Sequence, residues 1–122
     1  MLPRYQRITR SGEFSAVLRG GRGVSRRAGG PLVVVHRRDF EATESSEPTR
    51  SPRVGFVVSK AVGNSVVRHR VTRQLRALMA SRMESLPAGA GIVVRAQPDA
   101  ASADFGHLST ELDRCLDKVA GE

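Results

Sequence analysis

The hydrophobic and polar positions of the chain predict helices and strands in mixed order. Apolar residues recur at helical spacing in three segments, over about 12–19, 65–85 and 105–119. Short runs of β-branched residues predict three strands, at 32–36, 53–59 and 91–97. The order is helix, strand, strand, helix, strand, helix, with room for one further hairpin strand. This order predicts a sheet covered by helices.

Three segments outside these elements are mostly polar. Residues 1–10 are basic and are expected to be extended, because Pro3 disfavours an early helix. The basic, glycine-rich stretch GRGVSRRAGG over 21–30 is expected to be a loop. Residues 41–52 carry three glutamates and two prolines, and they predict a mobile acidic connection between strands.

Length and composition predict one domain, residues 1–122, with an aliphatic core. Of the 122 residues, 39% are hydrophobic and only 4% are aromatic. The N-terminus has no signal-peptide pattern, and no segment approaches the ~20 apolar residues of a membrane span. We therefore expect a cytoplasmic protein with no membrane partner. The single cysteine, Cys115, is expected to be a small buried residue, and it excludes an intrachain disulfide.

The charge of the chain favours a nucleic acid as partner. Lysine and arginine number 20 against 12 acidic residues, which gives a formal net charge of +8. Arginine far outnumbers lysine, and its planar guanidinium group binds phosphate in a bidentate way. The alternative is a basic surface that contacts only solvent. The charge pattern of the long helix helps to decide between the two interpretations.

On a helical wheel, the helix over 65–85 has an apolar side and a basic side. The apolar stripe spans about 120° and comprises Val67, Val71, Leu75, Leu78 and Met79. The basic side comprises His69, Arg70, Arg73 and Arg76. Arg68 is the exception, because it falls within the arc of the stripe. It belongs to the first turn, where a long side chain can still reach solvent.

No acidic residue compensates the charge of this helix. The sequence has none between Lys60 and Met83, and Glu84 is the first. Solvated helix faces usually mix signs, since like-charged neighbours cost ~0.2–0.5 kcal/mol per pair. An external polyanion would relieve this repulsion, so the helix predicts a nucleic-acid-binding face.

The residues do not form a recognisable catalytic or metal-binding pattern. His36, His69 and His107 belong to a strand, the basic helix and the start of the last helix. His107 and Glu111 have the spacing of a surface pair on a helix, and Asp99 and Asp104 are typical of a loop before a helix. No metalloprotease, phosphate-loop or Cys–His spacing occurs. We expect no catalytic residue and no metal ligand in the protein itself.

The stretch SKAVGNSVVRHRVTRQLR resembles the protein subunit of bacterial ribonuclease P. The resemblance rests on Val58-Ser59-Lys60, Gly63-Asn64, Arg68-His69-Arg70, Arg73 and Arg76. It extends to RITRSGEFSAVLRGGRGVS, which is similar to the family's first helix and the following loop. It also extends to IVVRAQP at 92–98, which is similar to its last strand, so it covers roughly residues 5–119.

The resemblance implies both a fold and a function. The fold would be a two-layer α/β (α+β) sandwich, whose small mixed sheet contains a left-handed β-α-β crossover around the basic helix. The chain would be the non-catalytic protein subunit of a ribonucleoprotein endoribonuclease. Its partner RNA would remove the 5′ leader of precursor tRNA, with Mg²⁺ bound mainly by that RNA.

The resemblance also implies two sets of binding residues. The catalytic RNA would be bound by Lys60, Asn64, Arg68, His69, Arg70, Arg73 and Arg76. A cleft between the first helix and the sheet would hold the single-stranded leader, through Phe14, Leu18, Val33, Val35 and Val57. The residues by themselves predict ordinary core at all five cleft positions, and this interpretation stays open for each of them.

The chain departs from the family pattern at several positions. His69 stands where the family usually has Asn, Leu18 and Val35 where relatives often have aromatics, and Ala61 and Thr72 where basic residues are frequent. Leader binding would then depend more on phosphates than on base stacking, which contributes ~1–3 kcal/mol per base.

Two other classes of function share the basic charge. One is a structural RNA-binding protein of the ribosomal type. The other is a DNA-binding regulator, but the exposed face of the long helix offers almost only arginine, and no helix-turn-helix pair precedes it. We therefore expect no DNA partner.

Overall fold

The structure is a computed structural model, which describes residues 25–39, 52–86 and 90–120. The predicted helix over 12–19, the basic segment 1–10 and most of the acidic connection 41–52 lie outside these residues. Phe14 and Leu18, two of the five predicted cleft residues, therefore also lie outside the described part.

The described strands form one mixed sheet in the order β1-β2-β4-β3. They are β1 (Ser25–Gly29), β2 (Val33–Asp39), β3 (Arg53–Val57) and β4 (Ala90–Ala96). β2 is antiparallel to both of its neighbours, whereas β3 and β4 are parallel. The predicted mixed sheet is confirmed.

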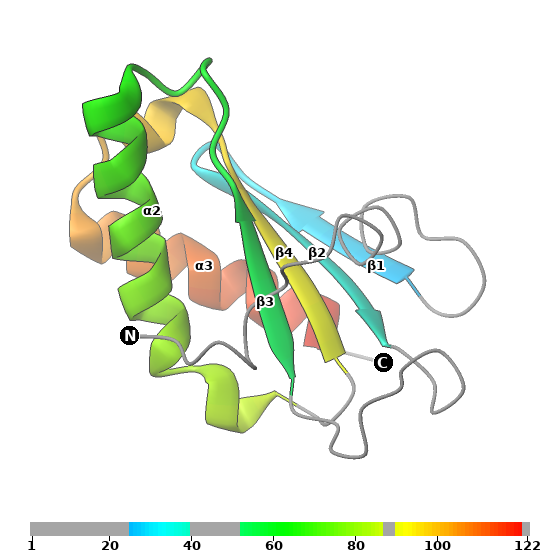
Figure 1. The fold of residues 1–122 in the computed structure, drawn as a ribbon. Coiled ribbons are helices and arrows are strands. Elements are labelled where there is room, and N and C mark those ends of the chain that lie inside the picture. Colours follow the sequence, from blue (N-terminus) through cyan, green and yellow to red (C-terminus); the bar gives the residue numbers. More distant parts are fainter. Residues whose placement is uncertain (1–24, 40–51, 87–89, 121–122) are drawn as a thin grey trace.

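Two long helices, α2 (Ser65–Ala80) and α3 (Phe105–Ala120), form the second layer. Figure 1 shows α3 crossing one face of the sheet, with α2 beside β3. Two short 3₁₀ helices, η3 (Met83–Ser85) and η4 (Pro98–Ala101), lie near the ends of β4. Both long helices bury their apolar stripes in one cluster with the same face of the sheet. None of the described helices is long and apolar enough to span a membrane.

The alternation of side chains along the strands decides which residues enter this core. Val33 and Val35 of β2, Val54 of β3, and Ile92 and Val94 of β4 all belong to the cluster. Val34 and Val93 are also buried, but they lie at the alternate positions and are not part of it. The sheet therefore has one face toward α2 and α3, and a second face with its own set of side chains.

The connection from β3 through α2 to β4 is the predicted left-handed crossover. In Figure 1, β3 runs upward, α2 lies to the left of β3, α3 lies behind the sheet, and β4 lies to the right of β3. Nearly all such connections are right-handed, so this one is a rare topology. It leaves α2 at the edge of the sheet, beside β3.

The glycine-rich stretch over 21–30 was predicted to be a loop, and this prediction is wrong for Ser25–Gly29, which form β1. The strand is held by pairing with β2, which the local sequence does not reveal. The turn between them is closed by a hydrogen bond from Gly30 N to Val33 O of 3.0 Å. The further hairpin strand for which the pattern left room is therefore β1.

α2 ends at Ala80, five residues earlier than the apolar pattern predicts. The amide of Arg82 donates to Met79 O at 2.9 Å, which is the tighter i→i−3 spacing of a 3₁₀ turn. The hydroxyl of Ser81 donates to Leu78 O at 2.9 Å and satisfies a carbonyl of the last turn. These bonds end the helix before Met83, which packs into the core from η3.

Candidate nucleic-acid interface

The N-terminus of α2 is held by Asn64, which the resemblance assigned to RNA binding. Its Oδ1 accepts a hydrogen bond from Val67 N at 3.0 Å, so the residue is the N-cap of the helix. Gly63 precedes it, and a Cβ at Gly63 would lie 2.9 Å from two side-chain carbons of Val67. The Gly-Asn pair thus has a structural role, which is to start α2 at this point.

The basic face of α2, which comprises His69, Arg70, Arg73 and Arg76, is exposed as the wheel predicts. On the other side of the helix, Val71, Leu75, Leu78 and Met79 are buried. The first turn carries no acidic residue. Lys60, in the loop before the helix, is exposed as well. The chain therefore gathers cations on an outward surface that is anchored by a buried stripe.

The arginines of the basic face differ in the hydrogen bonds that they make within the protein. Arg70 donates through Nη2 to the carbonyl of Ala101 and so connects α2 to η4. Arg73 and Arg76 make no hydrogen bond or ion pair with another described residue. Within the part of the chain that the structure describes, nothing occupies the donors of these two guanidinium groups.

Arg68 differs from the other arginines of the predicted set. It is half-buried, and its Nε is buried without a hydrogen-bond partner among the described residues. This agrees with its place within the arc of the apolar stripe. It can contribute to RNA binding only with the outer part of its side chain.

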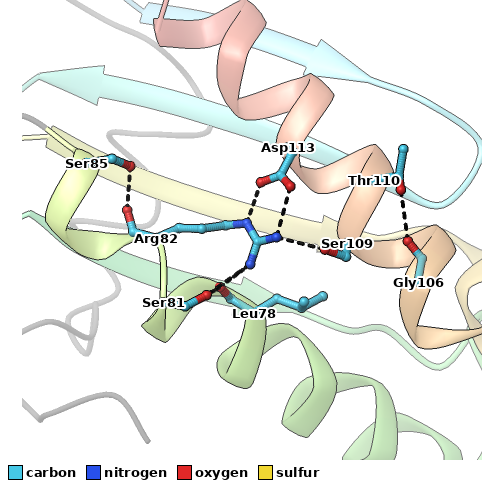
Figure 2. Close-up of polar contacts among 8 residues, drawn as sticks. All are labelled: Leu78, Ser81, Arg82, Ser85, Gly106, Ser109, Thr110 and Asp113. Carbon is cyan, nitrogen blue, oxygen red and sulfur yellow. Dashed lines mark hydrogen bonds and ion pairs between the residues drawn. The ribbon is translucent and has the colours of Figure 1, made fainter.

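A further arginine, Arg82, was not singled out in the sequence. Figure 2 shows its guanidinium group between the end of α2 and α3, facing Asp113. Nε and Nη2 donate to the two carboxylate oxygens of Asp113, Nη2 also donates to Ser109 Oγ at 2.8 Å, and Nη1 donates to Leu78 O at 2.6 Å. The hydrogen bonds from Arg82 hold the pKa of Asp113 below its ordinary value. Arg82 therefore joins the two helices and is not a free cation.

The predicted cleft residues do not share one face of the sheet. Val33 and Val35 have 0% of their surface exposed and pack in the cluster with α2 and α3. Val57 pairs with Arg95 and belongs to the second face, because it alternates with Val54 and Phe56. Val33 and Val35 therefore do not share a sheet face with Val57, and both lie in the core, as the residues by themselves predict.

The second sheet face carries a different set of side chains. Strand register brings Arg27, His36 and Val93 into one row across β1, β2 and β4. The adjacent row contains Val34, Arg95 and Val57. Arg27 and Arg95 are exposed, and His36 and Val57 are half-buried. Sequence reasoning did not place His36 and Arg95 on this face. Side chains alternate along each strand, but the register between strands is needed to tell which residues share a face with Val57.

The acidic residues near α3 have structural roles. Asp104 caps the helix by accepting from His107 N at 2.7 Å, and its other oxygen lies 2.9 Å from His107 Nδ1. His107 therefore pairs with Asp104, and the predicted surface pair with Glu111 is wrong. Glu111 is buried instead and accepts from Leu32 N at 2.6 Å and Val33 N at 2.7 Å. No three metal-ligating side chains come together within the described residues.

Comparisons with known proteins identify the family. The family model of ribonuclease P matches residues 2–120. The ribonuclease P protein component of Streptomyces griseus is 46% identical over 123 residues, which cover 99% of this chain and 97% of that protein. The corresponding protein of Corynebacterium diphtheriae is 43% identical over 120 residues, with coverages of 98% and 97%.

Solved structures show the same fold. The RNase P protein of Staphylococcus aureus superposes with a TM-score of 0.76 at 21% identity, covering 93% of this chain and 94% of that one. The RNase P protein of Thermotoga maritima gives a TM-score of 0.68 at 19% identity, with coverages of 88% and 92%. Because the family model and relatives above 40% identity match almost the whole chain, the chain belongs to the ribonuclease P protein family.

Proposed function

We propose that the protein binds the catalytic RNA of ribonuclease P through the basic face of α2 and the 5′ leader of precursor tRNA through the second sheet face. The observation that carries the proposal is the arrangement of α2. Its arginines face outward with no acid on the helix, while its other side is anchored in the core. This is the footprint expected of a helix that contacts a phosphate backbone.

The electrostatics of α2 favour a polyanion over solvent. Like charges one turn apart cost ~0.2–0.5 kcal/mol per pair in an isolated helix. Phosphates placed against Arg73 and Arg76 remove this cost and release condensed counterions, which contributes favourably to binding. Arg70 gives the face a fixed orientation, because it is already bonded to Ala101 of η4.

The second sheet face suits a single strand of RNA. Arg27 lies opposite His36 on β1, Arg95 lies diagonally from it on β4, and Val57 offers an apolar contact. No aromatic residue lies on the described part of this face, so phosphate contacts would contribute more than base stacking.

In this proposal the RNA does the chemistry. Mg²⁺ would be held mainly by RNA oxygens, which are the hard ligands it prefers. The protein would contribute binding and orientation of the precursor. Removal of tRNA leaders would place it in the cytoplasm.

Reconstitution tests the proposal directly. Precursor tRNA is incubated with the protein alone, with the catalytic RNA alone, and with both, at low and moderate Mg²⁺. We expect no cleavage by the protein alone and faster cleavage by the complex than by the RNA at low Mg²⁺. Cleavage by repurified, RNA-free protein would overturn the assignment of chemistry to the RNA.

A second experiment separates this function from that of a ribosomal RNA-binding protein. The tagged protein is isolated from its host, and the copurifying RNA is sequenced. Enrichment of one ribozyme RNA supports the proposal. Enrichment of ribosomal RNA, lost in an Arg73→Gln/Arg76→Gln variant and retained in a Lys118→Gln control, would support the alternative.

A further inference from the structure

The second sheet face contains a histidine surrounded by cations. His36 lies in the middle of β2, directly opposite Arg27 of β1 and Val93 of β4. Directly opposed residues of an antiparallel pair have Cβ atoms about 4.5–5.5 Å apart, so Arg27 is within reach of the imidazole. Arg95 lies opposite Val34, which places it diagonally from His36 on the same face.

Every charged position described on this face is basic. β1 contributes Arg27 and β4 contributes Arg95, while register also assigns Arg53 of β3 to this face. The carboxylates whose side chains the structure describes lie on η3, on η4, at Asp104 and on α3, so none of them faces His36.

The protonation state of His36 follows from these surroundings. Burial, then the charge of Arg27, then that of Arg95 lower its pKa from the ordinary value of 6.5. At neutral pH the lowered pKa therefore favours the uncharged imidazole in the free protein. An anion lying between Arg27 and Arg95 would cancel their repulsion and favour the imidazolium form.

We propose that His36 takes up a proton when the single-stranded leader binds across the second sheet face, so that affinity for the leader rises as the pH falls. The inference rests on the proposed function, because it names a regulation of the same site. The protonated ring gives the phosphate backbone a third cation between the two arginines. Affinity then changes by up to about tenfold per pH unit between the free and bound titration midpoints of His36.

Nuclear magnetic resonance of the free protein provides the first test. The chain has only three histidines, so each imidazole can be assigned with a single His→Gln variant and titrated separately. Adding a short single-stranded RNA should raise the titration midpoint of His36. His107, which lies on α3 and not on this face, serves as the reference histidine. A saturating oligonucleotide that leaves the His36 midpoint unchanged overturns the inference.

Binding by the reconstituted complex provides the second test. Affinity is measured from pH 5.5 to 8 for precursor tRNA with a leader and for the same tRNA without one, using a cleavage-resistant precursor. The ratio of the two affinities isolates the leader. We expect it to rise as the pH falls in the wild-type complex, and to be independent of pH with His36→Gln. His107→Gln, at the start of α3 and outside both proposed binding surfaces, should leave the pH dependence unchanged.

An Arg95→Gln variant distinguishes failure of the inference from failure of the proposed function. If Arg95→Gln lowers the leader-dependent affinity at every pH, but His36→Gln keeps the wild-type pH dependence, the leader site stands and the proton linkage is wrong. If Arg95→Gln changes nothing at any pH, the leader does not bind this face, and both fail.

Discussion

At the scale of single residues, arginines of one sequence cluster have different roles. Arg73 and Arg76 point outward and keep their donors free of other described residues, Arg68 is half-buried, and Arg82 is bonded to Asp113, Ser109 and Leu78. The difference comes from what lies opposite each side chain in the fold. Formal charge alone therefore overstates the number of cations available to RNA.

The contact between Arg82 and Asp113 leads to a prediction about stability. Hydrogen bonds to charged groups contribute ~1.5–3 kcal/mol, and the exposure of Asp113 should reduce the contribution here to about 1–2 kcal/mol. We therefore expect Arg82→Gln to lower the free energy of unfolding by about that amount at pH 7, as measured by urea denaturation. Arg76→Gln, a matched change on the basic face, should have little effect.

The pH dependence of this difference has a defined sign. Arg82 lowers the pKa of Asp113 in the folded state, below the ordinary value of 3.8. The contribution is therefore fully present above that value and is lost as the pH falls through the lower folded pKa. The difference in stability between wild type and Arg82→Gln should therefore shrink in strong acid to what the hydrogen bonds to Ser109 and Leu78 contribute. A difference that stays constant down to pH 2 would show that the ion pair is not its cause.

A second prediction at this scale concerns Glu111. Its carboxylate accepts from two backbone amides at the start of β2, and an unsatisfied buried donor costs about 1–3 kcal/mol. Glu111→Ala should therefore destabilise the protein by about 2–4 kcal/mol, whereas Glu111→Gln keeps an acceptor and should cost less than half of that. Asp117→Ala, an exposed change on the same helix, should stay within about 0.5 kcal/mol. Equal losses for Glu111→Ala and Asp117→Ala would contradict the role of the two amides.

At the scale of elements, α2 combines a structural surface with the surface proposed to bind RNA. Its buried stripe packs on the sheet and its N-cap fixes where the first turn begins. The left-handed crossover leaves the helix at the edge of the sheet, with its basic face outward. Binding energy can thus be applied to a helix that the core already holds in place.

This arrangement predicts the salt dependence of RNA binding. Each phosphate neutralised by a cation contributes ~0.7–0.9 to the slope of log affinity against log salt concentration. Arg73→Gln should weaken binding to the catalytic RNA and lessen that slope by about this amount, as measured by filter binding over a range of salt. Lys118→Gln removes the same charge from α3. It should change the affinity and the salt slope much less than Arg73→Gln does. An Arg73→Gln protein with wild-type affinity and slope would exclude the basic face.

At the scale of the whole molecule, the net charge of +8 opposes compaction. An anion that binds only the folded state stabilises it by about 2.7 kcal/mol at 100 times its Kd. We therefore expect phosphate or sulfate to raise the melting temperature more than chloride does at matched ionic strength. Arg73→Gln/Arg76→Gln should lose much of this gain.

Sulfate also strengthens apolar burial in general, so the double variant is the necessary comparison. The Lys118→Gln protein controls for lost charge. If the double variant responds to phosphate as the wild type does, the basic face is not the anion site.

The sequence by itself determined the helices and strands that have a clear local periodicity, and it determined the basic face of α2. The division of α2 into buried Val71, Leu75, Leu78 and Met79 and exposed His69, Arg70, Arg73 and Arg76 follows from 3.6 residues per turn, and the structure confirms it. The three valine-rich strands and α3 follow in the same way. The family could also be predicted from the sequence, because its most specific residues are contiguous along the chain. The match of the family model confirms that prediction.

Only the tertiary structure decided what depends on residues far apart in the sequence. β1 forms because β2 pairs with it, and Glu111 and Arg82 acquire partners 27 to 79 residues away. Which side of a strand faces the helices is a matter of register, and a shift by one residue exchanges the two faces. For this reason the sequence did not reveal that Val33 and Val35 lie on another face than Val57, or that His36 and Arg95 share a face with Val57.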